Sequence, residues 1–507
     1  MHGRFGFLLL IIAAFCGVRV LPVQAQTAST LTLLQKNHAE LRAEYVGQLQ
    51  RIAAFCGEHG FPDGTAEIER LLAPADGQRI RASSLPKNVE PELPAELPAE
   101  ERQWRTQLRY QRKEYAKKLY LLSRRALHAG FPAYAYELVR ELAVQDPDHA
   151  KARELLGYVL YKDEWVTPYA KKMLLKGADW DDRFGWLPKG HLARYENDER
   201  FVDGRWMSVA KEATIRQDFA HAWEINTDHY RIRTNYSLER GVELGRALEE
   251  FYEFFHQTFA GFFNDPEQLK RLFDGTAPGV VTGKKQYLVN YYRTREEYVE
   301  RLERAFPQIR VTNGIYLTGD RTAHFYHDET NDHEATLFHE GTHQLFFESN
   351  PQNRQIGEAA HFWIIEGIAC YMESFRRENG EFSVGDPKYI RFAGARMNAL
   401  DQNYYMPFPE FDGMGMREFQ NAPMLVKNYT QAAGLAHFFM QYDSGRYRDA
   451  LVTHLVQLYS ANARKREAPQ TLDQLTGTSA RDLDREYHDW LRQCRETLGE
   501  TATTPAQ

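Results

Sequence analysis

The chain has few cysteines and no closely spaced pair of them. Its 507 residues include only 4 cysteines, and no two of these form a Cys-x-x-Cys motif. Disulfide-framework proteins use sets of regularly spaced cysteines, and thiolate zinc sites are built from Cys-x-x-Cys pairs. We therefore expect neither kind of site. A single bridge between Cys56 and Cys494 stays open.

Clustered positive charge and long apolar runs are also missing. The net charge is −7, from 63 basic and 70 acidic residues spread along the chain. A nucleic-acid-binding protein would concentrate Lys and Arg on one face, so we expect no nucleic-acid partner. After residue 25 no stretch approaches 18 continuous apolar residues, the usual minimum for a membrane span. The mature protein is therefore expected to be soluble, with no membrane partner.

The first 25 residues differ from the rest of the chain. The positive start MHGR precedes the apolar run FGFLLLIIAAFCGV, and the small-residue segment VQA follows at 23–25. This is the order of a signal peptide, so we expect export to the periplasm or the exterior, with cleavage after Ala25. A retained N-terminal membrane anchor is the alternative. Cys16 does not indicate a lipoprotein, because bulky Phe15 precedes it.

The next part of the sequence predicts helices separated by a spacer. Apolar residues three and four apart indicate an N-terminal helical segment at 26–82. Four prolines among glutamates make 83–100 an extended linker. Residues 101–162 then have the pattern of a helical hairpin broken at 146–148, which resembles a tetratricopeptide unit and would serve a protein partner. A local hairpin packed on its neighbours is the alternative.

Residues 163–216 contain a short internal repeat. YKDEWVTPYAKK, from Tyr161, and VDGRWMSVAKEA, from Val202, share an acidic turn, a Trp and a step into a Lys-bearing segment. Trp165 and Trp206 occupy equivalent places. We expect two small turn modules in which Trp is the packing anchor. A ligand-stacking role for these rings is the alternative.

The third region, 217–495, mixes both kinds of structure. Alternating polarity in AWEINTDHYRIRTN and QYLVNYYR indicates strands, and GIYLTGDRTAHFYHD indicates a hairpin. A helix is expected at 238–263 and another over ATLFHEGTHQLFFES, 335–349. Residues 496–507 are expected to form a disordered tail. The fold class is therefore α+β and predominantly helical.

The helix at 335–349 carries polar residues where a buried helix needs none. His339 and His343 are four residues apart, so both rings project from one helical face. That geometry suits two nitrogen ligands of one zinc ion, with Glu340 as general base for the metal-bound water. A pair of ordinary helical histidines is the alternative.

A zinc site of this kind needs a third protein ligand. In one class of zinc peptidase a His stands six positions after the second His, but this chain has Ser349 there. The stretch FWIIEGIACYMES instead offers Glu366. Its apolar surroundings make a carboxylate costly unless a cation or a hydrogen-bond donor satisfies it. Glu358 and His361, in the polar connection, are rival ligands.

With HEGTH at 339–343 and EGIACYME at 366–373, the chain resembles the gluzincins, the zinc peptidase clan that includes thermolysin-like enzymes and zinc aminopeptidases. The whole-chain pattern is similar to a family of exported bacterial proteins with such a domain. The resemblance implies a metallopeptidase domain at 217–495 and one Zn²⁺ per chain. It implies the ligands His339, His343 and Glu366.

The same resemblance assigns supporting roles. Glu373 would orient a ligand His, with a solvent-facing position as the alternative. Tyr429 would donate to the oxyanion, with His437 as a rival and packing as the alternative. The chain departs from thermolysin-like enzymes at Cys370, where they have Asp. The aminopeptidase strand is missing, and 322–328 is instead expected to be an edge strand that pairs with substrate.

The expected function is an exported zinc-dependent peptidase that hydrolyses a peptide or protein substrate, with Glu340 as general base. The alternative is a catalytically inactive, peptidase-like scaffold that binds a partner through its helical front half.

Overall fold

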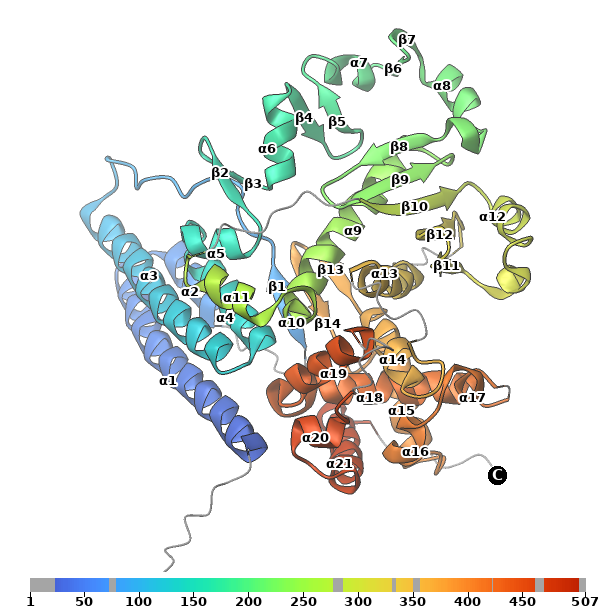
Figure 1. Ribbon diagram of the computed structural model, residues 1–507. Coiled ribbons are helices and arrows are strands. Elements are labelled where there is room, and N and C mark those ends of the chain that lie inside the picture. Colours follow the sequence, from blue (N-terminus) through green and yellow to red (C-terminus); the bar gives the residue numbers. More distant parts are fainter. Residues whose placement is uncertain are drawn as a thin grey trace, which may run out of the picture.

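The computed structural model describes residues 23–72, 79–276, 286–330, 334–349, 356–421, 423–460 and 469–500. The predicted signal peptide, and with it the alternative of a membrane anchor, lies outside the described residues except for its last three. Among the residues that are described, no helix is both long enough and apolar enough to cross a bilayer. The protein is a predominantly helical α+β structure, as the sequence predicts (Figure 1).

Helices form the front of the molecule. The long helices α1 and α3 lie side by side, and α3 and α4 form an antiparallel hairpin (Figure 1). Their apolar faces share one core. The predicted hairpin is thus packed on its neighbours, and the tetratricopeptide likeness stays a prediction. The bounds are α1 Val23–Glu58, α2 Pro62–Leu72, α3 Ala99–His128, α4 Pro132–Gln145 and α5 Ala150–Leu155.

The N-terminal segment ends differently from the prediction. Residues Ile80–Ser83 form a strand, β1, which pairs antiparallel with β14, Glu381–Val384. The following proline-rich stretch is extended up to α3, as expected. Two backbone hydrogen bonds attach this stretch to the first turn module. The backbone N–H of Trp165 donates to the Lys87 carbonyl at 2.7 Å, and the backbone N–H of Val89 donates to the Asp163 carbonyl at 3.0 Å. The spacer therefore packs on the turn modules.

The turn modules number three within residues 159–216, one more than the sequence indicates. Each is a β-hairpin followed by a short helix: β2 Val159–Tyr161, β3 Glu164–Val166 and α6 Pro168–Leu175; β4 Ala178–Asp181, β5 Gly185–Pro188 and α7 Leu192–Glu196; β6 Glu199–Val202, β7 Arg205–Ser208 and α8 Val209–Arg216. Each second strand carries a Trp opposite a large apolar residue: Trp165 opposite Leu160, Trp186 opposite Trp180 and Trp206 opposite Phe201. The sequence repeat does not reveal the middle module, because the turn of its hairpin is one residue longer.

A five-stranded sheet follows, with the order β11-β12-β10-β9-β8. The three inner strands are parallel, and the two outer ones are antiparallel to them. AWEINTDHYRIRTN forms the two strands β8 and β9, because residues 227–229 turn the chain. The bounds are η1 Phe219–His221, β8 Trp223–Asn226, β9 Tyr230–Thr234, α9 Leu238–Thr258, α10 Ala260–Phe263, α11 Pro266–Phe273, β10 Tyr287–Tyr292, α12 Arg295–Leu302, η2 Pro307–Val311, β11 Gly314–Leu317 and β12 Thr322–Tyr326.

The expected edge strand is not at the edge. The predicted hairpin forms, but β12 lies between β11 and β10 and pairs with both. Residues 322–328 therefore have no free backbone edge for a substrate, and that prediction is wrong. The outer strand at this end of the sheet is β11, because the hairpin places its first strand on the outside.

Helices complete the rest of the chain. Strands β13 and β14 form a small sheet with β1. The last helix, α21, continues to Leu498, so the first three residues of the predicted tail are helical, and residues 501–507 lie outside the described part. The bounds are α13 Glu334–Ser349, α14 Phe362–Met372, β13 Arg376–Glu378, α15 Ile390–Leu400, α16 Phe408–Asp412, α17 Met416–Phe419, α18 Leu425–Gly445, α19 Arg448–Ser460, α20 Leu472–Thr476 and α21 Ala480–Leu498.

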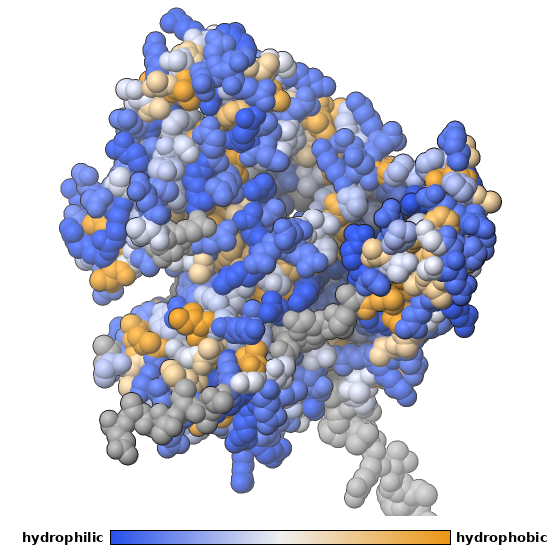
Figure 2. Space-filling view, turned by 180° about the vertical axis from the view of Figure 1, so that it is seen from behind, coloured by the Kyte–Doolittle hydropathy of each residue, from blue (hydrophilic) through white to orange (hydrophobic). Residues whose placement is uncertain are grey.

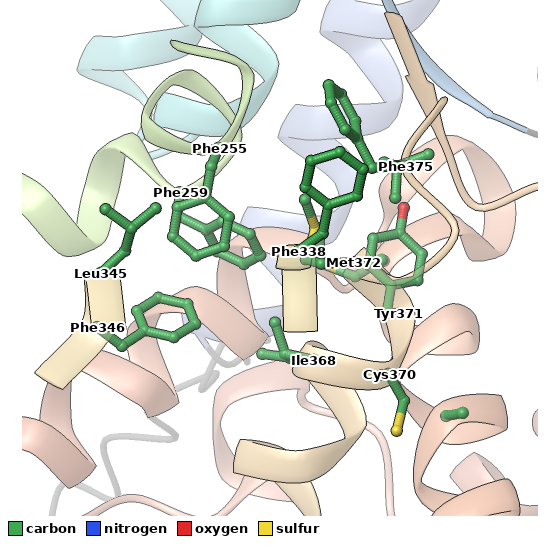
Figure 3. Close-up of a cluster of buried hydrophobic side chains, with 14 of the residues drawn as sticks. Phe255, Phe259, Phe338, Leu345, Phe346, Ile368, Cys370, Tyr371, Met372 and Phe375 are labelled. Carbon is green, nitrogen blue, oxygen red and sulfur yellow. The ribbon is translucent and has the colours of Figure 1, made fainter. Parts of the chain in front are cut away.

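Aromatic packing fixes the position of the helix at 335–349. Phe346 of α13 contacts Phe255 of α9 and Phe259, the residue after α9, edge-on at ring-centroid distances of 4.9 and 5.2 Å. Figure 3 shows these rings meeting in one cluster with side chains of α14. Pairs of this kind contribute about 0.5–1.5 kcal/mol each beyond area burial. The core therefore holds α13, α14 and α9 in one rigid arrangement.

The described cysteines are buried. Cys56, Cys370 and Cys494 are all buried and unpaired in the described part of the chain, so the open bridge between Cys56 and Cys494 is not formed. Figure 2 shows a face covered mainly by hydrophilic residues, with hydrophobic residues in small separate groups.

Candidate metal centre

Two helices bring the polar residues together. Helix α13 carries His339, Glu340 and His343, and α14 carries Glu366. The two helices pack against each other. Helix α14 is also pressed against α18, where a Cβ on Gly367 would meet the Ala432 carbonyl oxygen at 2.6 Å. A glycine after Glu366 is therefore required for this close approach.

The three predicted ligand atoms form a nearly equilateral triangle. The distance from His339 Nε2 to His343 Nε2 is 3.2 Å. Glu366 Oε2 lies 3.5 Å from the first nitrogen and 3.6 Å from the second. In a tetrahedral zinc site with bonds of 2.0–2.1 Å, ligand atoms are about 3.3 Å apart. The three side chains thus form a group that could hold a metal ion, and their spacing fits zinc.

The Glu366 carboxylate is charged although it is only 8% exposed. Burial alone would raise its pKa, but the charge of His343 and hydrogen bonds with His339 and His343 outweigh burial and hold the pKa well below its usual range. A buried carboxylate is stable only beside a cation or donors. The rivals Glu358 and His361 do not join this group within the described residues.

Glu373 is hydrogen-bonded to the His339 ring. Its Oε1 contacts His339 Nδ1 at 2.9 Å, which leaves Nε2 facing the triangle. Arg391 donates to both carboxylate oxygens and the Tyr389 hydroxyl donates to one, each at 2.9 Å. Burial raises the pKa of Glu373, but the bonds from His339 and Arg391 outweigh it and lower the pKa to about 2. At 6% exposure, the solvent-facing alternative is wrong.

Cys370 lies close to both His339 and Glu373. One atom from each of the three residues lies within 4.8 Å of the others. Burial raises the pKa of the Cys370 thiol, so it stays neutral near pH 7. Cys370 therefore contributes no charge to this group, and Glu373 supplies the carboxylate.

Glu340 is anchored by the edge strand. The backbone N–H of Tyr316, on β11, donates to Glu340 Oε2 at 2.8 Å. A backbone donor fixes the direction of the carboxylate without adding a charge. The Glu340 side chain thus connects α13 to β11, one of the two outer strands of the sheet.

Tyr429 and His437 have different surroundings. Burial raises the pKa of the Tyr429 hydroxyl, and the Glu366 carboxylate raises it further. The Tyr429 side chain therefore lies close enough to the triangle for the Glu366 charge to raise its pKa. His437 instead stacks on Phe392 at 4.3 Å, and its Nε2 contacts the Gly385 carbonyl at 3.0 Å. The rival is thus part of the core.

Several residues that contribute to the candidate site could not be found from a sequence pattern. Arg391 and Tyr389 follow Glu373 beyond the hairpin of β13 and β14, and the Tyr316 donor is a backbone group that any residue except proline carries. A third group of potential ligands, His361, Asp412 and His454, gathers residues far apart in the sequence. The chain matches no protein-family model and no curated protein.

Proposed function

We propose that the protein is an exported, gluzincin-type zinc peptidase that holds a catalytic Zn²⁺ through His339, His343 and Glu366. The observation that carries the proposal is the triangle of ligand atoms, 3.2–3.6 Å on each side. The triangle contains three protein atoms and leaves a fourth position for water or substrate, as catalytic zinc sites do.

The zinc would supply a Lewis acid for the scissile carbonyl and for the attacking water. Glu340 accepts the proton of that water and transfers it to the leaving amine. Its carboxylate is held in position by the Tyr316 N–H. Glu373 and Arg391 keep the His339 ring in the tautomer that presents Nε2.

Tyr429 acts as the oxyanion donor in this proposal. Its raised pKa keeps the phenol protonated at neutral pH, so the hydroxyl remains a donor. A donor directed at a developing negative charge stabilises the transition state more than the ground state. Tyr429 lies near the start of α18. Because α18 packs on α14, the position of Tyr429 relative to Glu366 is fixed.

The substrate would add to the outer edge of β11. Strand β11 is at the end of the sheet order and pairs only with β12 among the described strands. An extended peptide can pair with such an edge through its backbone. Because Tyr316 of β11 binds Glu340, a peptide on this edge would have its backbone beside the general base. This arrangement favours an extended peptide or an unfolded protein segment as substrate.

The decisive experiment compares wild type with Glu340→Gln. Wild type loaded with zinc is expected to cleave members of a peptide library. Glu340→Gln should keep the metal, because Glu340 is not a ligand, and should lose about 10²–10⁴-fold of the activity. The measurements are zinc content by elemental analysis and cleavage by mass spectrometry. Zinc at His339 with no cleavage of any library member would favour the scaffold alternative.

A further inference from the structure

A second cluster of potential ligands lies at the start of α14. It joins His361, which precedes α14, Asp412, which ends α16, and His454 of α19. One ligand atom from each lies within 4.8 Å of the other two. His361 Nδ1 is 2.9 Å from Asp412 Oδ1, and the two imidazole rings meet edge to face at 5.1 Å.

His454 carries an unused buried lone pair. The side chain is 0% exposed, and its Nδ1 bonds the Gln470 carbonyl at 2.7 Å. A carbonyl only accepts, so Nδ1 holds the proton. Burial, with the neighbouring His361, lowers the pKa of His454, which keeps the ring neutral and leaves Nε2 as an acceptor. Among the described residues Nε2 has no hydrogen-bond partner. Such a buried orphan costs about 1–3 kcal/mol and calls for a physical explanation.

Asp412 is oriented for a role beyond a simple hydrogen bond. The indole Nε1–H of Trp363 donates to Asp412 Oδ1 at 2.7 Å. The His361 N–H also donates to the Asp412 carbonyl at 2.8 Å. Carboxylates and imidazoles that ligate metals are usually held by such outer donors. The 2.9 Å contact between His361 and Asp412 is also close to the spacing of two ligands on one ion, about 3.3 Å.

His361 has a strained backbone. Its φ is +62°, in the left-handed region that favours glycine. Non-glycine residues in such regions cost about 1–3 kcal/mol and concentrate at functional sites. Here the strain directs the ring toward Asp412 and His454.

We propose that His361, Asp412 and His454 form a second divalent-metal site, with His454 Nε2 as one of the ligands. Two imidazoles and one carboxylate are a donor set for zinc or a similar transition metal. The ion would join the start of α14 to α16 and α19. His361 precedes Glu366 by five residues, or about 7.5 Å of helix rise, so the two sites share no residue. The second ion would position the helix that carries the third ligand of the proposed catalytic site.

The experiment counts metal ions per full-length chain, after zinc loading and removal of excess metal. Wild type should hold two. His454→Asn should hold one, because the amide keeps the donor to the Gln470 carbonyl and removes Nε2. His339→Ala should also hold one, and the double variant none. The matched control is His437→Asn, another buried His bonded to a backbone carbonyl, which should keep two.

Asp412→Asn provides a second variant that keeps the acceptor for Trp363, and circular dichroism verifies folding. Unchanged metal counts in both His454→Asn and Asp412→Asn would overturn the proposal and leave the cluster as a hydrogen-bond network. Failure of the catalytic site is a separate outcome: His339→Ala would then hold as many ions as wild type. A wild type with a single ion that only His454→Asn loses would support this site and contradict the proposed function.

Discussion

At the scale of single residues, Glu373 connects the proposed metal centre to the rest of the fold. It bonds His339 on one side and Arg391 and Tyr389 on the other. The negative charge of the carboxylate is thus balanced by a guanidinium, and the direction of the imidazole is fixed before any metal arrives. Ligand rings that are held in advance lose less conformational freedom on binding.

Glu373→Gln is expected to weaken zinc binding without unfolding the protein. The amide keeps the volume but loses the charge that favours an Nδ1–H on His339. Loss of such an outer carboxylate costs about 10–100-fold in metal affinity. Competition with a chromogenic chelator measures the change. Glu358→Gln is the control, since this exposed carboxylate lies outside the ligand group, and its affinity should match wild type. If Glu373→Gln binds zinc as tightly as Glu358→Gln does, Glu373 does not have the proposed role.

The residues of the candidate ligand group could be predicted from the sequence, but the residues that support them could not. His339 and His343 stand at helical spacing, and Glu366 is a carboxylate among apolar neighbours, so each leaves a local signal. Arg391 reaches Glu373 only because a small sheet turns the chain back between them. His454 reaches His361 from a helix more than 90 residues later. Such meetings depend on the tertiary fold, which no local pattern encodes.

At the scale of elements, the contact between α14 and α18 sets the place of Glu366. The helices approach so closely that Gly367 faces the Ala432 carbonyl without room for a side chain. A shift of α14 by a fraction of an ångström would change the two sides of the ligand triangle that end on Glu366, because His339 and His343 lie on a different helix.

Gly367→Ala is therefore expected to destabilise the fold and the metal site together. The new methyl group would lie 2.6 Å from the Ala432 oxygen, and overpacking of this kind costs about 1–3 kcal/mol. The free energy of unfolding, measured in urea, and the zinc affinity should both decrease. Gly47→Ala is the control, because nothing lies within 4 Å of its Cβ position on α1 and alanine favours a helix. A stability of Gly367→Ala equal to wild type would show that α14 can move freely.

Element types were easier to predict from the sequence than element order. Periodicity identified α9, α13 and the β11–β12 hairpin, because these are local patterns. It merged β8 with β9, since both strands alternate and only three residues separate them. It also assigned the edge to the wrong strand of the hairpin. Sheet order depends on β10 pairing with β12 across more than 30 residues, which alternation does not reveal.

At the scale of the whole molecule, the front helices and the proposed peptidase half are joined by buried charges. Arg448 of α19 forms an ion pair with Glu137 of α4. Asp449 accepts from the Ala133 N–H at the start of α4, at 3.1 Å. The Tyr158 hydroxyl donates to Glu253 of α9 at 3.0 Å. The two halves therefore share an interior, and its charges depend on pH.

Glu253 should make the protein less stable as the pH rises. Burial, with the nearby Glu249 and Glu250 carboxylates, raises its pKa from 4.5 to about 7, against smaller opposing effects of Tyr158 and His229. Between those values the folded state binds a proton that the unfolded state does not. The stabilisation is complete below about pH 4.5 and is lost as the pH passes 7, a change of about 3 kcal/mol.

Glu253→Gln tests this pH dependence. The amide keeps the acceptor for Tyr158 and cannot ionise, so the variant should be more stable than wild type at pH 8 and similar at pH 5. Denaturant unfolding at both pH values gives the difference. Glu243→Gln, at an exposed position of the same helix, should follow the wild-type profile. Parallel profiles for wild type and Glu253→Gln would mean that Glu253 is already ionised when folded.

Strand β1 has a consequence for how the chain is made. Its partner β14 is synthesised about 300 residues later, so at about 5–20 residues per second the ribosome needs roughly 15–60 s to deliver it. During that interval Ile80–Ser83 has no sheet to join. A fragment that starts at residue 217 would have the opposite problem, an uncovered β14 edge two residues from Arg376–Glu378 and close to Glu373. Folding of the whole chain is thus completed by a single late event, the capture of β1 by β14.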